Sequence, residues 1–142
     1  MRRYLLLGLL AVLAACSRTP DEQRIREAVT AMQRAAEQHS PRDFMAHVAD
    51  DFVGNEDPGF DKNALSNLLR GEVLRDDVTG VTLGPIDVEI QGDRASVKVT
   101  ATLTGGKGGL LPEHGAVYSI TSGWRRNGRD WVCFSGRWTQ EL

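Results

Sequence analysis

The spacing of apolar residues changes from helical to alternating near Val78, and this change constrains the fold more than any other feature of the sequence. Before Val78, apolar residues recur every three or four positions, as on one side of a helix. After it, they alternate with polar residues, as on one face of a sheet. Helices in the first half and strands in the second predict an α+β domain, because a parallel α/β fold would need helices and strands to alternate.

Three helices are expected in the first half. The first should span residues 20–38, since Thr19-Pro20-Asp21-Glu22 has the spacing of a capping box, with proline at the first helical position. The second should span residues 41–51. Its buried side would consist of Phe44, Met45, Val48 and Phe52. Asp61 is expected to cap the third helix, which should end or bend near Gly71 because glycine weakens a helix by about 1 kcal/mol relative to alanine.

The second half is expected to form an antiparallel sheet. A break at Gly84-Pro85 changes the parity of the apolar residues around it, and a bulge there would return all of them to one face. These residues are Val81, Leu83, Ile86, Val88 and Ile90. Gln91-Gly92-Asp93-Arg94 should be a hairpin turn that leads into a strand over residues 95–104, apolar on one side and polar on the other.

Asn127-Gly128 predicts a hairpin between strands 116–125 and 131–138. A symmetric turn would place Tyr118 opposite Arg137. One face would carry Ile120, Trp124, Trp131 and Cys133, and the other Val117, Val132, Phe134 and Trp138. Because both faces are apolar, we expect the hairpin to be covered on both sides, with a partner or a second copy of the chain as the second cover.

The N-terminus has the pattern of a secretory signal peptide: two arginines, a short apolar run and small residues. The run has about half of the 20 apolar residues that a membrane-spanning helix needs. Leu13-Ala14-Ala15-Cys16 resembles the lipobox of bacterial lipoproteins, which implies cleavage before Cys16 and acylation of that residue. A plain cleaved signal is the alternative. The expected organisation is a signal peptide over 1–15, a lipidated Cys16 with a short tether over 16–19, and one domain over 20–142.

Charge and cysteine content exclude several classes of function. Without residues 1–15 the chain has 15 basic and 19 acidic side chains, a net charge of −4, which argues against nucleic acid as a partner. A lipidated Cys16 leaves Cys133 as a lone thiol, expected to be buried, so no disulfide is expected. The three histidines are scattered and no cysteine cluster exists, so neither a metal site nor a cofactor is expected.

The order of elements resembles the nuclear transport factor 2-like (SnoaL-like) superfamily. The resemblance is carried by residues 25–38, by residues 44–53 with Asp50-Asp51-Phe52-Val53 at their end, and by Gly123-Trp124-Arg125, Trp131-Val132 and Arg137-Trp138. It implies a cone-shaped α+β roll, in which a curved antiparallel sheet wraps around the helices and leaves a pocket at its open end. It also implies that a homodimer could form through the outer sheet face, which would suit the apolar Val132, Phe134 and Trp138.

Two groups of residues are candidates for acid–base chemistry in such a pocket. Asp43, His47 and Asp51 are spaced i, i+4 and i+8, so a helix would place an imidazole between two carboxylates. The alternative is a solvated helix face with ion pairs. Glu56 and Asp57 lie in a predicted loop of the kind often found near the pocket mouth, and simple exposure is again the alternative.

Three further features are weaker candidates. Tyr118 opposite Arg137 could bind an anionic ligand, or form a structural pair. Glu113-His114 lies in the glycine-rich segment 105–115, where surface exposure is the simpler interpretation. The same segment lacks the lysine-serine/threonine and helix that follow a phosphate-binding P-loop, so a mobile hairpin loop is expected instead.

The sequence therefore favours a non-catalytic, membrane-anchored domain that binds a small apolar ligand or a protein partner. An isomerase or dehydratase using a pocket Asp or His is the first alternative, and an accessory or immunity-type lipoprotein that binds another protein is the second. Ser17 after Cys16 resembles an outer-membrane sorting signal, so the expected location is the periplasmic side of the outer membrane of a Gram-negative bacterium.

Overall fold

The computed structural model of the chain describes residues 19–73, 78–105 and 114–141. The helical elements are α1 (Pro20–Glu37), α2 (Pro41–Met45), α3 (Lys62–Leu68) and the π-helical turn η1 (Leu69–Val73). The strands are β1 (Val48–Gly54), β2 (Val78–Leu83), β3 (Asp87–Gln91), β4 (Arg94–Gly105), β5 (His114–Asn127) and β6 (Asp130–Gln140). Among these residues no helix is long and apolar enough to cross a membrane.

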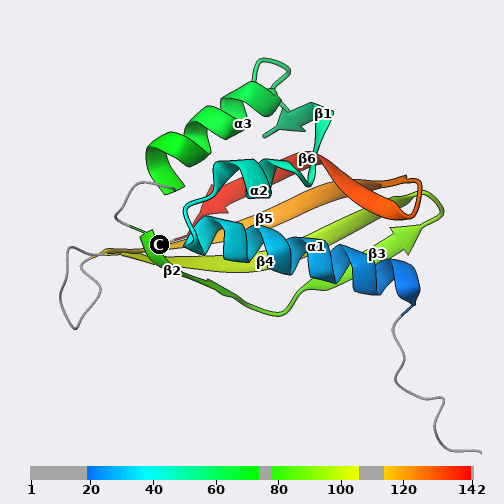
Figure 1. The fold of residues 1–142 in the computed structure, drawn as a ribbon, viewed down its shortest axis with the longest axis horizontal. Coiled ribbons are helices and arrows are strands. Elements are labelled where there is room, and N and C mark those ends of the chain that lie inside the picture. Colours follow the sequence, from blue (N-terminus) through cyan, green and yellow to red (C-terminus); the bar gives the residue numbers. More distant parts are fainter. Residues whose placement is uncertain (1–18, 74–77, 106–113, 142) are drawn as a thin grey trace, which may run out of the picture.

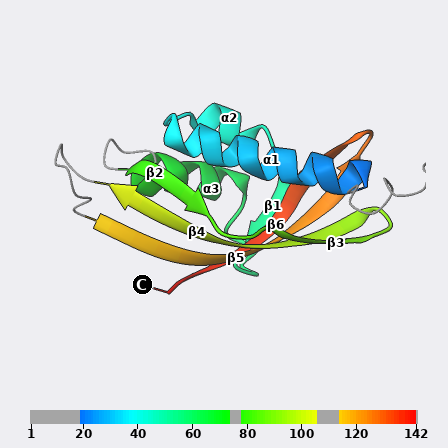
Figure 2. The same cartoon turned by 90° about the horizontal axis from the view of Figure 1, so that it is seen from below.

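One curved sheet carries all the helices on one face (Figures 1 and 2). Its strand order is β1-β6-β5-β4-β2, and β3 also pairs with β4. The pairs among β2 to β6 are antiparallel, whereas β1 runs parallel to β6. The predicted α+β class with a curved sheet is confirmed, with one parallel strand added at its edge.

The helix starts follow the predicted capping signals. The Thr19 hydroxyl accepts a hydrogen bond from the Glu22 backbone N–H at 3.2 Å, and the Asp61 carboxylate accepts one from the Ala64 N–H at 2.9 Å. Each bond satisfies a donor that the first turn of a helix leaves without a partner. The predicted end or bend near Gly71 is also confirmed, because regular α-helix stops at Leu68 and continues as η1.

The predicted second helix over residues 41–51 is wrong in its second half. Helix α2 ends at Met45, and residues 48–54 form strand β1. The Cys133 N–H donates to the His47 carbonyl at 2.9 Å, and the Asn55 N–H donates to the Gly136 carbonyl at 2.8 Å. Pairing of β1 with β6 at both ends therefore decides the structure of this segment. The spacing of Phe44, Val48 and Phe52 alone would also fit one side of a helix.

Strands β2 and β3 lie one after the other along the same edge of β4. Leu83 pairs with Ala101 in β2, and Val88 pairs with Val97 in β3. Because the β4 partners have the same parity, the apolar residues of β2 and β3 share the helix-covered face. The prediction that the break at Gly84-Pro85 restores one apolar face is confirmed.

The hairpin of β5 and β6 forms, but its predicted register is wrong. Asn127 pairs with Asp130, so the two turn residues are Gly128 and Arg129. Trp124 then pairs with Cys133, while Gly123 pairs with Ser135, which leaves Phe134 as the extra residue of a bulge.

The bulge exchanges the faces of the residues that follow it in β6. Trp138 pairs with Ile120 and lies on the inner face, rather than on the outer face with Val132 and Phe134 as predicted. Tyr118 pairs with Gln140, so the predicted pairing of Tyr118 with Arg137 is also wrong. A single inserted residue has this effect because side chains alternate between the two faces of a strand.

The core lies between α1 and the inner face of the sheet. Ile25 of α1 and Val97 of β4 are fully buried, and Trp124 is 1 % exposed. The start of α1 is tied to the hairpin by Asp21, which accepts two hydrogen bonds from the Arg126 guanidinium at 2.9 Å and one from the Trp131 indole N–H at 3.1 Å. These contacts hold α1 across the inner face of the sheet. The space that remains between the helices and the sheet forms a cavity.

Candidate functional site

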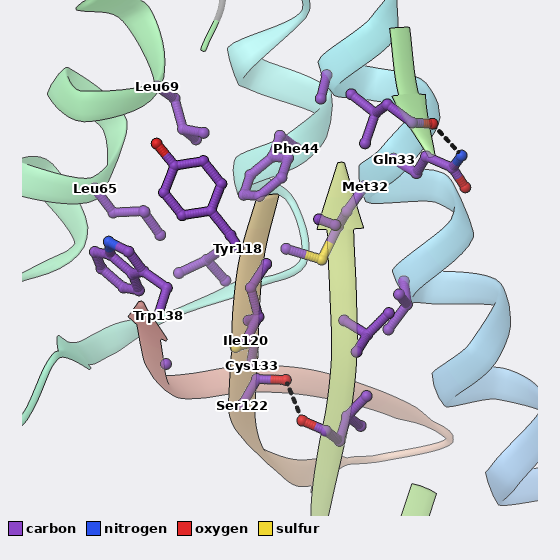
Figure 3. A pocket seen from close by; sticks show the side chains of 18 of the residues that line it. Met32, Gln33, Phe44, Leu65, Leu69, Tyr118, Ile120, Ser122, Cys133 and Trp138 are labelled. Atoms are coloured by element: carbon purple, nitrogen blue, oxygen red, sulfur yellow. Dashed lines mark hydrogen bonds between the residues drawn. The ribbon is translucent and has the colours of Figure 1, made fainter. Parts of the chain in front are cut away.

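The helices and the concave face of the sheet enclose an apolar cavity of about 300 Å³. All helices and five strands contribute to its wall, so the whole domain shapes it (Figure 3). Large side chains of the wall come from α1, α2, α3, η1, β5 and β6. They include Met32, Phe44, Leu65, Leu69, Tyr118, Ile120 and Trp138. A cavity of this size is at the lower end of the range for small-molecule sites.

Few polar groups reach the cavity, and two of these are already hydrogen-bonded. The Gln33 amide donates to the Val81 carbonyl at 2.7 Å, and the Ser122 hydroxyl accepts from the Trp124 indole at 2.9 Å. The Tyr118 hydroxyl has a long contact of 3.5 Å to the Gln140 side chain. Figure 3 shows the Tyr118 ring reaching from β5 towards α3 and η1. The Tyr118 hydroxyl is therefore the polar group best placed to bond a ligand.

Among the described wall residues none is Asp, Glu, His, Lys or Arg. The titratable groups there are the Tyr118 phenol and the Cys133 thiol. Burial raises the pKa of Cys133 to about 12, and its Sγ donates to the Ser135 carbonyl at 3.2 Å. The thiol is therefore protonated at neutral pH and a poor nucleophile. The cavity can hold an apolar molecule, but its wall offers little for proton transfer.

The three residues predicted to share a helix face do not do so. Asp43 is exposed on α2, His47 lies in the link to β1, and Asp51 belongs to β1. Asp51 forms an ion pair of 2.7 Å with Arg125, which lies over the outer-face residue Phe134. Hydrogen bonding from Arg125 holds the pKa of Asp51 below its usual value, so this carboxylate stays ionised. None of the three lines the cavity.

Of the other predicted residues that the structure describes, only Tyr118 lines the cavity. Asp57 is exposed and its carboxylate accepts from the Gly59 N–H at 2.9 Å, within its own loop. Glu56 and Arg137 form an exposed ion pair of 3.1 Å. Cys16 and Glu113 lie outside the described residues, as does most of the segment 105–115, and only the backbone of His114 is described, at the start of β5.

Sequence reasoning missed Trp138 and Gln33 as cavity residues. No signal in the sequence marks the bulge that turns Trp138 inwards. Gln33 interrupts the apolar stripe of α1 between Met32 and Ala36, and a polar residue next to such a stripe is a weak signal by itself.

The outer face of the sheet is less apolar than predicted. The Phe134 ring is covered by the guanidinium groups of Arg94 and Arg125, 5.3 Å and 5.8 Å from its centroid. Polar and charged residues border a shallow groove beside it, among them Ser96, Thr121, Ser135 and Arg137. Because Trp138 faces inwards, only Val132 and Phe134 remain on this face of the three residues expected to carry a homodimer. A homodimer through this face stays a prediction.

Comparison with known proteins identifies the fold. No family model matches the sequence, and no curated protein matches it. Solved structures do match: an NTF2-like protein with a cystatin-like fold from Novosphingobium aromaticivorans is 20% identical, with a TM-score of 0.65, covering 83% of this chain and 80% of its own. An NTF2-like protein of unknown function from Pseudomonas putida is 18% identical, with a TM-score of 0.67, covering 88% of this chain and 89% of its own.

A third similar structure is larger. Bd1075 from Bdellovibrio bacteriovorus is 14% identical with a TM-score of 0.68 over 82% of this chain, and this chain spans 40% of that protein. Identities this low establish architecture and leave activity open. The chain has the fold of the NTF2-like proteins.

Proposed function

We propose that this protein is a membrane-anchored lipoprotein whose NTF2-like domain binds a small, uncharged apolar molecule in its cavity. The observation that carries the binding proposal is the composition of the cavity wall, in which the described residues include no ionic side chain. An ionised ligand would lose its hydration there without gaining a partner charge, which is unfavourable by several kcal/mol. A neutral apolar ligand gains about 25 cal/mol for each Å² of apolar surface removed from water.

The Tyr118 hydroxyl would orient such a ligand. Its contact with Gln140 is at the long limit for a hydrogen bond, so a ligand carbonyl or hydroxyl could accept from it at a better distance. A ligand with one polar end and an apolar body fits this arrangement. Catalysis by the predicted Asp or His residues receives no support, because Asp51, Asp57 and His47 do not line the cavity.

The binding proposal is tested with the uncharged fluorescent probe N-phenyl-1-naphthylamine and the chain from residue 17 onwards. The probe should become fluorescent and be displaced by neutral apolar compounds. Ile120→Trp places a large side chain in the cavity and should weaken binding at least tenfold. Ser119→Trp is the matched control, because Ser119 is the neighbouring residue in β5 and is exposed on the outer face. Equal binding by both variants would contradict the proposed location.

The lipid anchor rests on the lipobox pattern at Cys16. Cys16→Ala in the full chain should abolish the mass added by acyl chains and release the protein from the membrane fraction. Cys133 provides the matched control, since Cys133→Ala removes the other cysteine and should leave acylation unchanged. Membrane retention of the Cys16→Ala variant would exclude lipidation as the means of attachment.

A further inference from the structure

The two ends of the domain differ, and the lipid anchor would be attached at one of them. The first residue of α1 is Pro20, and the hairpin turns β3–β4 and β5–β6 lie at the same end as this helix start (Figure 1). Arg24 Nη1 donates to the Arg129 carbonyl in the β5–β6 turn at 2.7 Å. Arg126 links this turn to Asp21 and to Asp93 in the β3–β4 turn. We call this region the turn end.

Among the described wall residues of α1, β4 and β5, several that are partly exposed lie towards the opposite end. Along β5, Trp124 near the turn is 1 % exposed, whereas Ile120 and Tyr118 are partly exposed. Along β4, Val97 is fully buried and Leu103 is partly exposed. Met32, Gln33 and Ala36, which line the cavity, belong to the second half of α1. Within the described part of the chain, the cavity is therefore closed towards the turn end, and its partly exposed wall residues place the mouth towards the other end.

The lengths of β5 and α1 give the distance between the cavity mouth and the turn end. Nine residues of β5 separate Tyr118 from Asn127, which is about 30 Å at 3.3 Å per residue. Helix α1 has 18 residues and is about 27 Å long at 1.5 Å per residue. Only three residues follow Cys16 before Pro20, so the tether reaches about 10 Å. The tether therefore keeps the start of α1, and with it the turn end, within about 10 Å of the bilayer surface.

The turn end carries guanidinium groups that can contact lipid phosphates. Arg126 is paired with Asp21 and Asp93, and Arg26 with Glu22. Among the described residues of the turn end, the exposed Arg24, Arg129 and Asp130 are in no ion pair, so two guanidinium groups are available to headgroup phosphates against one unpaired carboxylate. This attraction acts over about 10 Å at 0.1 M salt, which matches the reach of the tether.

We infer that the turn end, with Arg24 and Arg129, rests on the phospholipid headgroups, so that α1 stands away from the bilayer and the cavity mouth faces the aqueous phase. This orientation rests on the proposed lipid anchor at Cys16. It means that a ligand enters and leaves through water or from a soluble partner, and is not taken directly from the membrane.

The test uses the full acylated chain in vesicles of phosphatidylethanolamine and phosphatidylglycerol that carry a spin-labelled headgroup quencher. Gln23→Cys and Glu37→Cys place a fluorophore at exposed positions near the two ends of α1, about 21 Å apart along the helix. Cys133 is buried and should remain unlabelled. We expect quenching to be severalfold stronger at position 23 than at position 37. Equal quenching would mean that the helix lies flat and would overturn the orientation.

The role of the two arginines is tested in the same vesicles. Arg24→Gln with Arg129→Gln should raise quenching at position 37, because the turn end loses its hold on the headgroups and the domain tilts. Arg34→Gln is the matched control, since Arg34 is exposed near the other end of α1. An unchanged quenching pattern in the double variant would refute the arginine contact. A chain that carries no acyl mass and does not float with vesicles would overturn the anchor as well, whereas probe binding in the cavity would still stand.

Discussion

The glycine pair at the junction of β1 and β6 gives a sharp test of how the cavity wall is packed. Gly54 and Gly136 are partners in the parallel ladder, yet a methyl group would have different surroundings at each. At Gly54 the new Cβ would lie 2.5 Å from Phe60 Cδ1 and 2.9 Å from Trp138 Cη2. At Gly136 its nearest neighbours would be Phe52 carbons at 3.5 Å and 3.6 Å, which is ordinary contact.

The expected effects have opposite signs. Alanine in place of glycine restricts the unfolded chain and stabilises a protein by about 0.4–1 kcal/mol where the backbone accepts it. At Gly54 this gain is exceeded by overpacking of the edge-to-face pair of Phe60 and Trp138, which costs about 1–3 kcal/mol. We therefore expect Gly54→Ala to lower the free energy of unfolding by roughly 1–2 kcal/mol. Gly136→Ala should leave it unchanged or raise it by up to about 1 kcal/mol.

Urea unfolding followed by tryptophan fluorescence measures both variants against the parent chain, with a constant m-value as the check that the same surface is exposed. Gly54→Ala should also weaken binding of N-phenyl-1-naphthylamine, because Trp138 must move and Trp138 lines the cavity. If Gly54→Ala proves as stable as Gly136→Ala, the described packing of Phe60 and Trp138 against β1 is incorrect.

Two further predictions concern titratable groups. Hydrogen bonds from Arg126, and next from Trp131, hold the pKa of Asp21 below 3.8, so this carboxylate stabilises the fold above that pH and the contribution is lost as pH falls below about 4. Asp21→Asn should therefore flatten the acid side of a plot of stability against pH, which melting curves measure. Cys133, whose pKa burial raises to about 12, should react with iodoacetamide at pH 8 only after urea unfolds the chain, and rapid labelling of the native protein would show that the thiol is accessible.

The sequence predicts most of the architecture because the local signals are strong there. Thr19 and Asp61 carry capping side chains, and the alternation in residues 95–104 specifies both a strand and its buried face. The break at Gly84-Pro85 could be interpreted correctly because both flanking segments are apolar at alternate positions. In each case the deciding interaction is between residues close in sequence.

The errors occur where a distant segment decides the structure. Val48 and Phe52 fit a helix as well as a strand, and the choice depends on β6, about 85 residues later. The bulge at Phe134 fixes the direction of Trp138, but it arises from the way β5 and β6 meet along their whole length. The presence of a pocket between the helices and the sheet was therefore predicted correctly. Of the residues proposed for it, only Tyr118 lines the cavity.

The position of β6 has a consequence for how this chain can acquire its structure. The last strand in the sequence lies between β1 and β5, and its neighbour Arg129 and its own Trp131 contact the first helix across sequence separations of 105 and 110 residues. Contacts of such high contact order slow folding, since a long loop must close before they form. In the described sheet β1 is joined to the other strands through β6, so β1 cannot join the sheet until this last strand has been synthesised.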